Sequence, residues 1–203
     1  IGFCLVGSEM CIRDSDSILS VRGVSKFFGG VRANNDVSIE VPRGKVFAII
    51  GPNGAGKTSL LNMISGFYVP DAGEIRFEDK PLTGLKPNQI AERGIGRTFQ
   101  NIALFRGMTV LQNMMLGRHV LMKTGVLSSF LYWGRAEREE VDHREKVEEI
   151  IDFLRLNDLR KAPTGALAYG LQKRVELGRA LAAEPELLLL DEPMAGMNQE
   201  EKE

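Results

Sequence analysis

The sequence has little cysteine, and what it has lies at one end. Its two cysteines, Cys4 and Cys11, stand within the first dozen of 203 residues. Residues 1–15 resemble translated adapter DNA from library preparation, so we expect a non-native, disordered segment there. The rest of the chain has no thiol. This excludes disulfides and thiolate metal sites and favours a reducing compartment.

The sequence also lacks an excess of either charge and a long apolar run. It has 26 Lys and Arg against 27 Asp and Glu, so no basic field could hold nucleic acid through its phosphates, and we expect no such partner. No apolar run approaches the ~20 residues that span a bilayer. A hydrophobic content of 43% suits a globular domain with a sizeable core.

A glycine-rich stretch with the pattern G-x-x-x-x-G-K-[ST] is the most informative feature present. The apolar run 46–50 before it predicts a buried strand, and the spacing of apolar residues in 59–64 predicts a helix. Strand, glycine-rich turn and helix are together typical of a phosphate-binding loop. The stretch consists of Gly51, Pro52, Asn53, Gly54, Ala55, Gly56, Lys57 and Thr58.

Each residue type in this loop has a physical role. The glycines allow the backbone N–H groups to point into one concavity, to which the following helix adds its positive end. Lys57 is expected to reach the β- and γ-phosphates, with Ser59 beside the site, and the Thr58 hydroxyl to ligate Mg²⁺. The alternative is a glycine-rich turn with a surface lysine, which the flanking strand and helix disfavour.

The remaining chain predicts an α/β fold. Antiparallel strands are expected early, short strands alternate with helices in the middle, and a mostly helical region precedes a last apolar strand. Thr109 to Gln112 has the form of a helix capping box. The charges of 135–149 indicate a solvated helix face rather than a binding surface. The expected strands are 18–22, 37–41, 45–50, 74–77, 95–99 and 187–190, and the expected helices include 59–64, 87–93 and one after Gly170; the helical region is 104–165.

The strand Leu187–Leu190 ends in two carboxylates. Adjacent parallel strands deliver their carboxyl ends to one crevice, where ligands of open α/β sheets bind. Asp191 is therefore predicted to hold Mg²⁺, and Glu192 to orient or deprotonate the water that attacks the γ-phosphorus. The alternative is a pair of carboxylates on a surface turn.

Four motifs in order resemble the ATPases of ABC transporters, over residues 16–203. They are the loop at 51–58, Gln100 after a short strand, the Leu-Ala-Tyr-Gly-Leu-Gln run at 167–172, and Leu-Leu-Leu-Leu-Asp-Glu-Pro at 187–193. The resemblance implies a P-loop NTPase (RecA-like) core with an N-terminal antiparallel β-subdomain and an inserted helical subdomain. The implied parts are 16–103, 104–166 and 167–203, the last with the core incomplete at its end.

The resemblance also implies a homo- or hetero-dimer with a second ATPase subunit, with two ATP molecules between the subunits. Phe28 would stack on adenine, although pattern alone favours a core position for it. Gln100 would contact Mg²⁺ or water and couple to the membrane subunit. Ala168, Tyr169 and Gly170 would contact the partner's γ-phosphate, with Ala168 replacing the usual serine. Residues 194–198 would form a dimer contact.

The stretches 96–101 and 104–110, with Leu-Ala-Tyr-Gly, look like the branched-chain amino-acid uptake subfamily. That implies permease partners, indirect contact with a solute-binding protein, and a peripheral place at the cytoplasmic face of the inner membrane. An importer of urea or another polar metabolite, or a non-transport ABC ATPase, is the alternative. Leu104 and Phe105 either line a groove for the permease or are buried in the helical subdomain.

The family's switch histidine would stand some tens of residues beyond Glu203. His119 and His143 lie upstream of the second half of the site and do not match it. We therefore expect this sequence to be a piece of a longer protein. A non-enzymatic alternative is that the piece binds nucleotide without turning it over.

Overall fold

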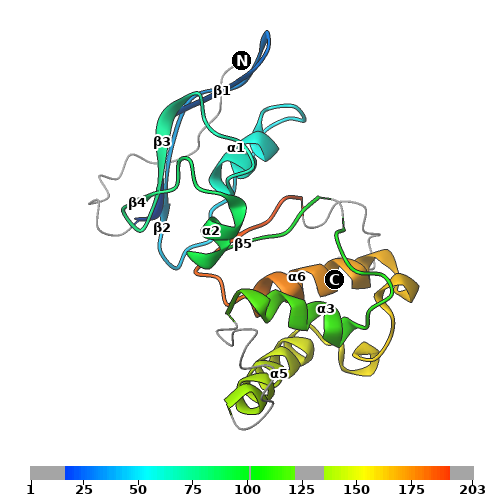
Figure 1. Ribbon diagram of the computed structural model, residues 1–203. Coiled ribbons are helices and arrows are strands. Elements are labelled where there is room, and N and C mark those ends of the chain that lie inside the picture. The colour runs from blue at the N-terminus through cyan, green and yellow to red at the C-terminus, as the bar shows by residue number, and fades with distance from the viewer. Residues whose placement is uncertain (1–16, 101, 122–134, 193–203) are drawn as a thin grey trace. The chain divides into compact units, whose positions relative to one another are not determined.

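The computed structural model describes residues 17–100, 102–121 and 135–192 (Figure 1). The chain forms two compact units, within which most of the contacts between residues lie. The first unit ends at Ile90 and the second begins at Ala91. The segment 1–15 and the predicted dimer contact 194–198 lie outside the described residues. No helix among the described residues is long and apolar enough to cross a membrane.

A four-stranded antiparallel sheet forms the first unit, with β1 at its centre between β2 and β3. Its strands are β1 (Ser17–Phe28), β2 (Val31–Pro42), β3 (Ala72–Phe77) and β4 (Lys80–Pro81), in the order β2-β1-β3-β4. The early antiparallel strands are thus confirmed. Half of the residues of β1 are buried, and the strand has a neighbour on each side.

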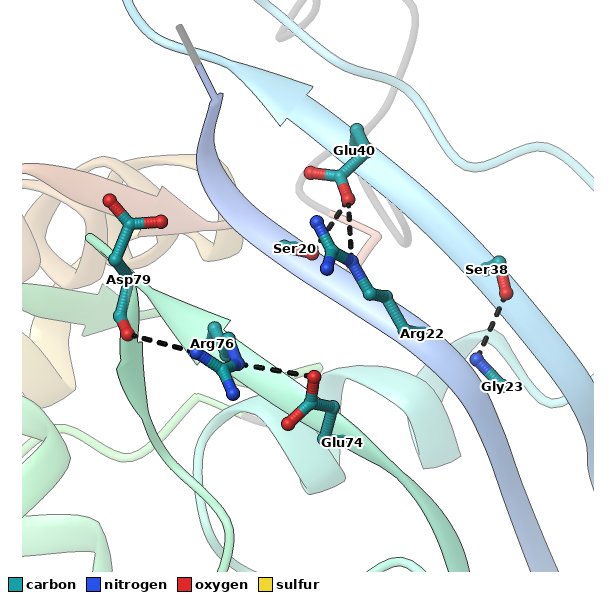
Figure 2. A network of polar contacts seen from close by, with 8 residues as sticks. All are labelled: Ser20, Arg22, Gly23, Ser38, Glu40, Glu74, Arg76 and Asp79. Atoms are coloured by element: carbon teal, nitrogen blue, oxygen red, sulfur yellow. Dashed lines mark hydrogen bonds and ion pairs between the residues drawn. The ribbon is translucent and has the colours of Figure 1, made fainter. Parts of the chain in front are cut away.

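Polar side chains link β1 to β2 next to a shift in their register, which lies between Val21 and Val24 (Figure 2). The Ser20 hydroxyl donates to Glu40 Oε1 at 2.6 Å, and Arg22 Nε donates to the same oxygen at 3.4 Å. The Gly23 N–H donates to the Ser38 hydroxyl at 2.9 Å. The bonds of Arg22 and Gly23 hold the two strands together where the regular ladder is interrupted, and Ser20 binds Glu40 within the regular ladder beside it.

Two helices complete the first unit. They are α1 (Lys57–Ile64), which follows the glycine-rich loop as predicted, and α2 (Pro87–Glu92), which begins at a proline and continues into the second unit. The core of the unit is apolar. It includes Leu19, Val21, Val24, Leu60, Met63, Ile64, Ile75, Phe77, Leu82 and Ile90.

The predicted buried strand at 46–50 is wrong. The segment is not a strand, Val46 is fully exposed, and Ile50 is 85% exposed. A strand forms only where a neighbour supplies backbone hydrogen-bond partners, and none of the described strands of this unit pairs with 46–50.

The second unit is mainly helical. It contains α3 (Val110–Gly117), η1 (Arg118–Leu121), α5 (Arg135–Phe153), η2 (Asn157–Leu159), η3 (Thr164–Ala166) and α6 (Tyr169–Ala182). In the described part of α5 the charged residues at 142, 144–146 and 149 are exposed, while His143 and Val147 face inward, so the solvated face is confirmed there. The core is Val110, Met114, Val147, Ile151, Leu156, Val175 and Ala182.

Two short parallel strands position the polar residues of this unit. β5 (Ile95–Arg97) pairs with β6 (Leu187–Leu189), and the Thr98 N–H donates to the Leu189 carbonyl at 3.0 Å. The predicted last strand is one residue too long, because Leu190 lies beyond it and is 42% exposed. Parallel pairing brings the residues after both strands to one edge.

Candidate functional site

The glycine-rich loop has the backbone geometry that its glycines predict. Gly54 and Gly56 have φ of +80° and +86°, and the Ala55 N–H closes a turn on the Pro52 carbonyl at 3.2 Å. A Cβ at Gly56 would lie 2.1 Å from the carbonyl oxygen of Ala33 on β2. Position 56 therefore requires glycine for two separate reasons, the left-handed backbone and the close approach.

Asn34 supports the same point of the loop and was not predicted from the sequence. Its side chain is only 3% exposed, and Nδ2 donates to the Gly56 carbonyl at 3.3 Å. The predicted strand at 37–41 did not reach residue 34, and the Gly56 partner lies 22 positions away. Asn34 anchors the loop to β2 immediately before α1 begins.

Lys57 and the start of α1 give the loop a positive character. Lys57 Nζ donates to the carbonyls of Gly51 and Pro52 at 2.7 and 2.9 Å, which holds the ammonium group against the loop. The first turn of α1, which carries Thr58 and Ser59, contains no acidic residue. Pro52, Asn53 and Gly54 are exposed. The arrangement suits an anion such as phosphate.

Phe28 lies at the end of β1 and is 42% exposed, so the alternative of a core position is wrong. The Tyr68 ring meets it edge-on, with centroids 5.1 Å apart and planes at 71°. Lys26 Nζ lies 5.6 Å from the centre of the Phe28 ring. An accessible ring held by such neighbours is suitable for stacking on a base, and its adenine role stays a prediction.

In the second unit, the edge beyond β5 and β6 brings two predicted residues together and pairs a third with an arginine. Gln100 Nε2 donates to Glu192 Oε2 at 3.2 Å. Arg97, at the end of β5, forms an ion pair with Asp191 Oδ2 at 3.3 Å. Asp191 is only 4% exposed, so it does not lie on a surface turn, whereas Glu192 is exposed.

Arg97 was not singled out from the sequence. Its guanidinium is 6% exposed and also lies over the Phe99 ring, 5.2 Å from its centre. A buried carboxylate is tolerated when a cation neutralises it. Arg97 therefore pairs with the Asp191 carboxylate and orients it at the edge where the two strands end.

The described residues contain no group of three or more His, Cys, Asp or Glu that could hold a metal ion. The predicted Mg²⁺ ligands are instead Thr58 in the first unit and Gln100 and Asp191 in the second. Hydroxyl, amide and carboxylate oxygens are the donors that Mg²⁺ prefers, and Mg²⁺ commonly takes one or two carboxylates together with substrate phosphates. The residues present fit that mode of binding.

Ala168 is the N-cap of α6 and forms no side-chain cap hydrogen bond. Tyr169 is 41% exposed, and the first turn contains no acidic residue. The helix begins two residues earlier than predicted, at Tyr169, so Gly170 lies inside its first turn. The backbone N–H groups here suit an anion, and their contact with a partner's phosphate stays a prediction.

Comparison with known proteins identifies the family. The family model described as ABC transporter matches residues 34–195. The chain belongs to the ABC transporter family. The similar proteins include the high-affinity branched-chain amino acid transport ATP-binding protein LivG of Escherichia coli K12, 40% identical over 92% of this chain and 73% of that protein. The probable LivG of Methanocaldococcus jannaschii is 40% identical over 92% of this chain and 72% of its own length.

Solved structures agree with this ABC assignment. A nucleotide-free ATP-binding cassette from an ABC transporter superposes with a TM-score of 0.75 at 38% identity, covering 92% of this chain and 73% of that one. An ABC transporter cassette in its ADP conformation gives 0.76 at 38% identity, covering 92% and 72%. The predicted P-loop NTPase fold and the predicted family are confirmed, and this ABC chain is a nucleotide-binding protein.

Proposed function

We propose that this chain is the ATP-binding and ATP-hydrolysing subunit of an importer that takes up branched-chain amino acids. The observation that carries the proposal is the 40% identity to LivG over 92% of the chain. The phosphate-loop geometry supports it, because a loop of this kind binds nucleotide phosphates.

The chemistry is assigned to residues in both units. Residues 51–59 bind the phosphates and Phe28 the adenine, while Lys57 neutralises charge that develops on the γ-phosphate. Glu192 orients the attacking water, and its contact with Gln100 keeps the two side chains within reach of each other. Bound Mg²⁺ would neutralise phosphate charge, with Thr58, Gln100 and Asp191 as its protein ligands.

The partners follow from the family assignment. A second ATPase subunit would present Ala168, Tyr169 and Gly170 to the γ-phosphate bound by the first. Permease subunits would dock on the chain and place it at the cytoplasmic face of the inner membrane. A solute-binding protein would act through the permease.

Nucleotide binding and phosphate release by the purified chain test the assignment. Lys57→Ala should abolish ATP binding, because the loop loses its cation. Glu192→Gln should retain ATP, lower turnover by at least about 100-fold and favour a stable dimer. Lys80→Ala, which removes an exposed lysine of β4, is the matched control and should behave like the parent. Equal turnover by Glu192→Gln and the parent would contradict the role of Glu192.

The solute requires a separate measurement. Cells that express the chain with its permease and solute-binding partners should accumulate labelled leucine, isoleucine and valine, and Lys57→Ala should stop that uptake. Uptake of urea in place of leucine would favour the related importer and reject the branched-chain assignment.

A further inference from the structure

The segment that follows β5 is fastened to α6 by charged side chains of that helix. Lys173 Nζ donates to the backbone carbonyls of Phe99 and Gln100 at 3.1 and 2.8 Å. Gln100 carries the side-chain amide that is predicted to be catalytic, and Phe99 is the residue before it. The backbone of Gln100 is therefore held by a side chain 73 positions later in the sequence.

Glu176 and Arg179, which follow Lys173 on α6 at intervals of three residues, bind Ala103 of the same segment. Glu176 Oε1 accepts the Ala103 N–H at 3.4 Å, and Arg179 Nη1 donates to the Ala103 carbonyl at 2.5 Å. Burial lowers the pKa of the Arg179 guanidinium below its ordinary value. Lys173, Glu176 and Arg179 will be called the α6 brace.

Lys173 and Glu176 of the brace are buried and form an ion pair, whereas Arg179 is half-buried. The Lys173 and Glu176 side chains are 6% and 2% exposed, and their charged groups lie 3.4 Å apart. A lysine is almost never buried unless its charge is paired and its donors are satisfied. The carbonyls of the segment are thus part of what makes the buried lysine tolerable, and the contact is specific.

The brace connects two places that the proposed function uses. At one end, Gln100 Nε2 donates to Glu192 at 3.2 Å. At the other, Lys173 lies one helical turn from Tyr169 and Gly170 at the start of α6, and its Nζ is 6.0 Å from the centre of the Tyr169 ring. A rigid helix that shifts would carry the backbone of Gln100 with it.

We propose that Lys173 is a positioning residue. It fixes the backbone of Gln100 to α6, so that the Gln100 amide stays in reach of Glu192 and follows any movement of the start of α6. The effect of Lys173 on turnover rests on the proposed ATPase function, whereas its effect on the backbone that follows β5 does not.

Amide hydrogen exchange of the full chain, resolved by residue, tests the brace itself. Lys173→Met should speed exchange of the Ala103 amide by about tenfold, because Glu176 loses its buried partner and the segment its anchor. Amides of Val147 and Ile151 in the core should be unchanged. Lys173→Arg, which can donate to both carbonyls, should restore protection, and the exposed Lys161→Met is the matched control. Unchanged exchange at Ala103 would overturn the proposal.

Kinetics then separate positioning from stability. Lys173→Met should lower kcat by about tenfold or more with KM for ATP within about twofold, and Lys173→Arg should recover most of the loss. If Lys173→Met does not fold, Lys173→Met/Glu176→Leu removes both buried charges and should show the same pattern. Equal losses in kcat for Lys173→Met and Lys173→Arg, or a change confined to KM, would overturn the proposal. Absence of turnover in the parent would reject the ATPase function and leave the exchange result to decide the brace.

Discussion

At the scale of single residues, Asp71 shows how one carboxylate fixes the strand end that carries Phe28. It accepts the Phe27 N–H at 2.7 Å and the Lys26 ammonium at 3.0 Å, while Lys26 also donates to the Val69 carbonyl at 2.8 Å. The backbone hydrogen bond from Phe27, followed by the one from Lys26, lowers the pKa of the Asp71 carboxyl below its ordinary 3.8.

A pH titration of stability tests this contact. Because the folded-state pKa lies below the unfolded one, the stabilisation is fully present above about pH 4 and is lost as pH falls through the folded value. Asp71→Asn should therefore be less stable than the parent at pH 7, and the difference should vanish in strong acid. Asp79→Asn, which removes an exposed carboxylate with no side-chain hydrogen bond among those described, is the control. A difference independent of pH would refute the assignment.

A comparison of substitutions at Gly56 and Gly54 separates the effect of backbone strain from that of steric overlap. Both have positive φ, but a Cβ at Gly54 meets nothing within 4 Å, whereas at Gly56 it would strike the Ala33 carbonyl. Gly56→Ala should thus be less stable than Gly54→Ala by about 1–3 kcal/mol in urea unfolding. Equal stability of the two variants would mean that the backbone of β2 moves away at Ala33, and it would contradict the prediction.

At the scale of the elements, the start of α3 is set by a capping box. The Gln112 N–H donates to the Thr109 hydroxyl at 3.2 Å, and the Thr109 N–H donates to the Gln112 side chain at 2.9 Å. Thr109→Ala should lower the free energy of unfolding by about 1 kcal/mol. Thr109→Ser should keep most of this stabilisation, because serine can also cap the helix. Indistinguishable unfolding midpoints for the alanine and serine variants would contradict this.

The elements predicted well are those whose signals are local. The helix after the glycine pattern, the capping box and the strand at 37–41 depend on neighbouring residues, and the structure confirms each of them. The 46–50 strand failed because an apolar run says nothing of which strand will pair with it. Asn34, Arg97 and Lys173 were missed because their partners lie 22, 94 and 73 positions away, distances that no local pattern encodes.

At the scale of the whole molecule, the chain spans 73% of the length of the E. coli LivG protein that it resembles and shares its family. The phosphate loop belongs to the first unit and the carboxylates to the second. We propose, as the central claim, that Lys57 and Asp191 serve one bound nucleotide, Lys57 at its phosphates and Asp191 through the metal.

Binding of Mn²⁺ in place of Mg²⁺, followed by electron paramagnetic resonance with and without ATP, tests that claim most directly. The parent should bind Mn²⁺ tightly only when ATP is present. Asp191→Asn should weaken this ATP-dependent binding by about tenfold or more, and Lys57→Ala should abolish it because the nucleotide is lost. Asp158→Asn, at an exposed position of η2, should have no effect. ATP-dependent Mn²⁺ binding that Asp191→Asn leaves unchanged would contradict a shared site.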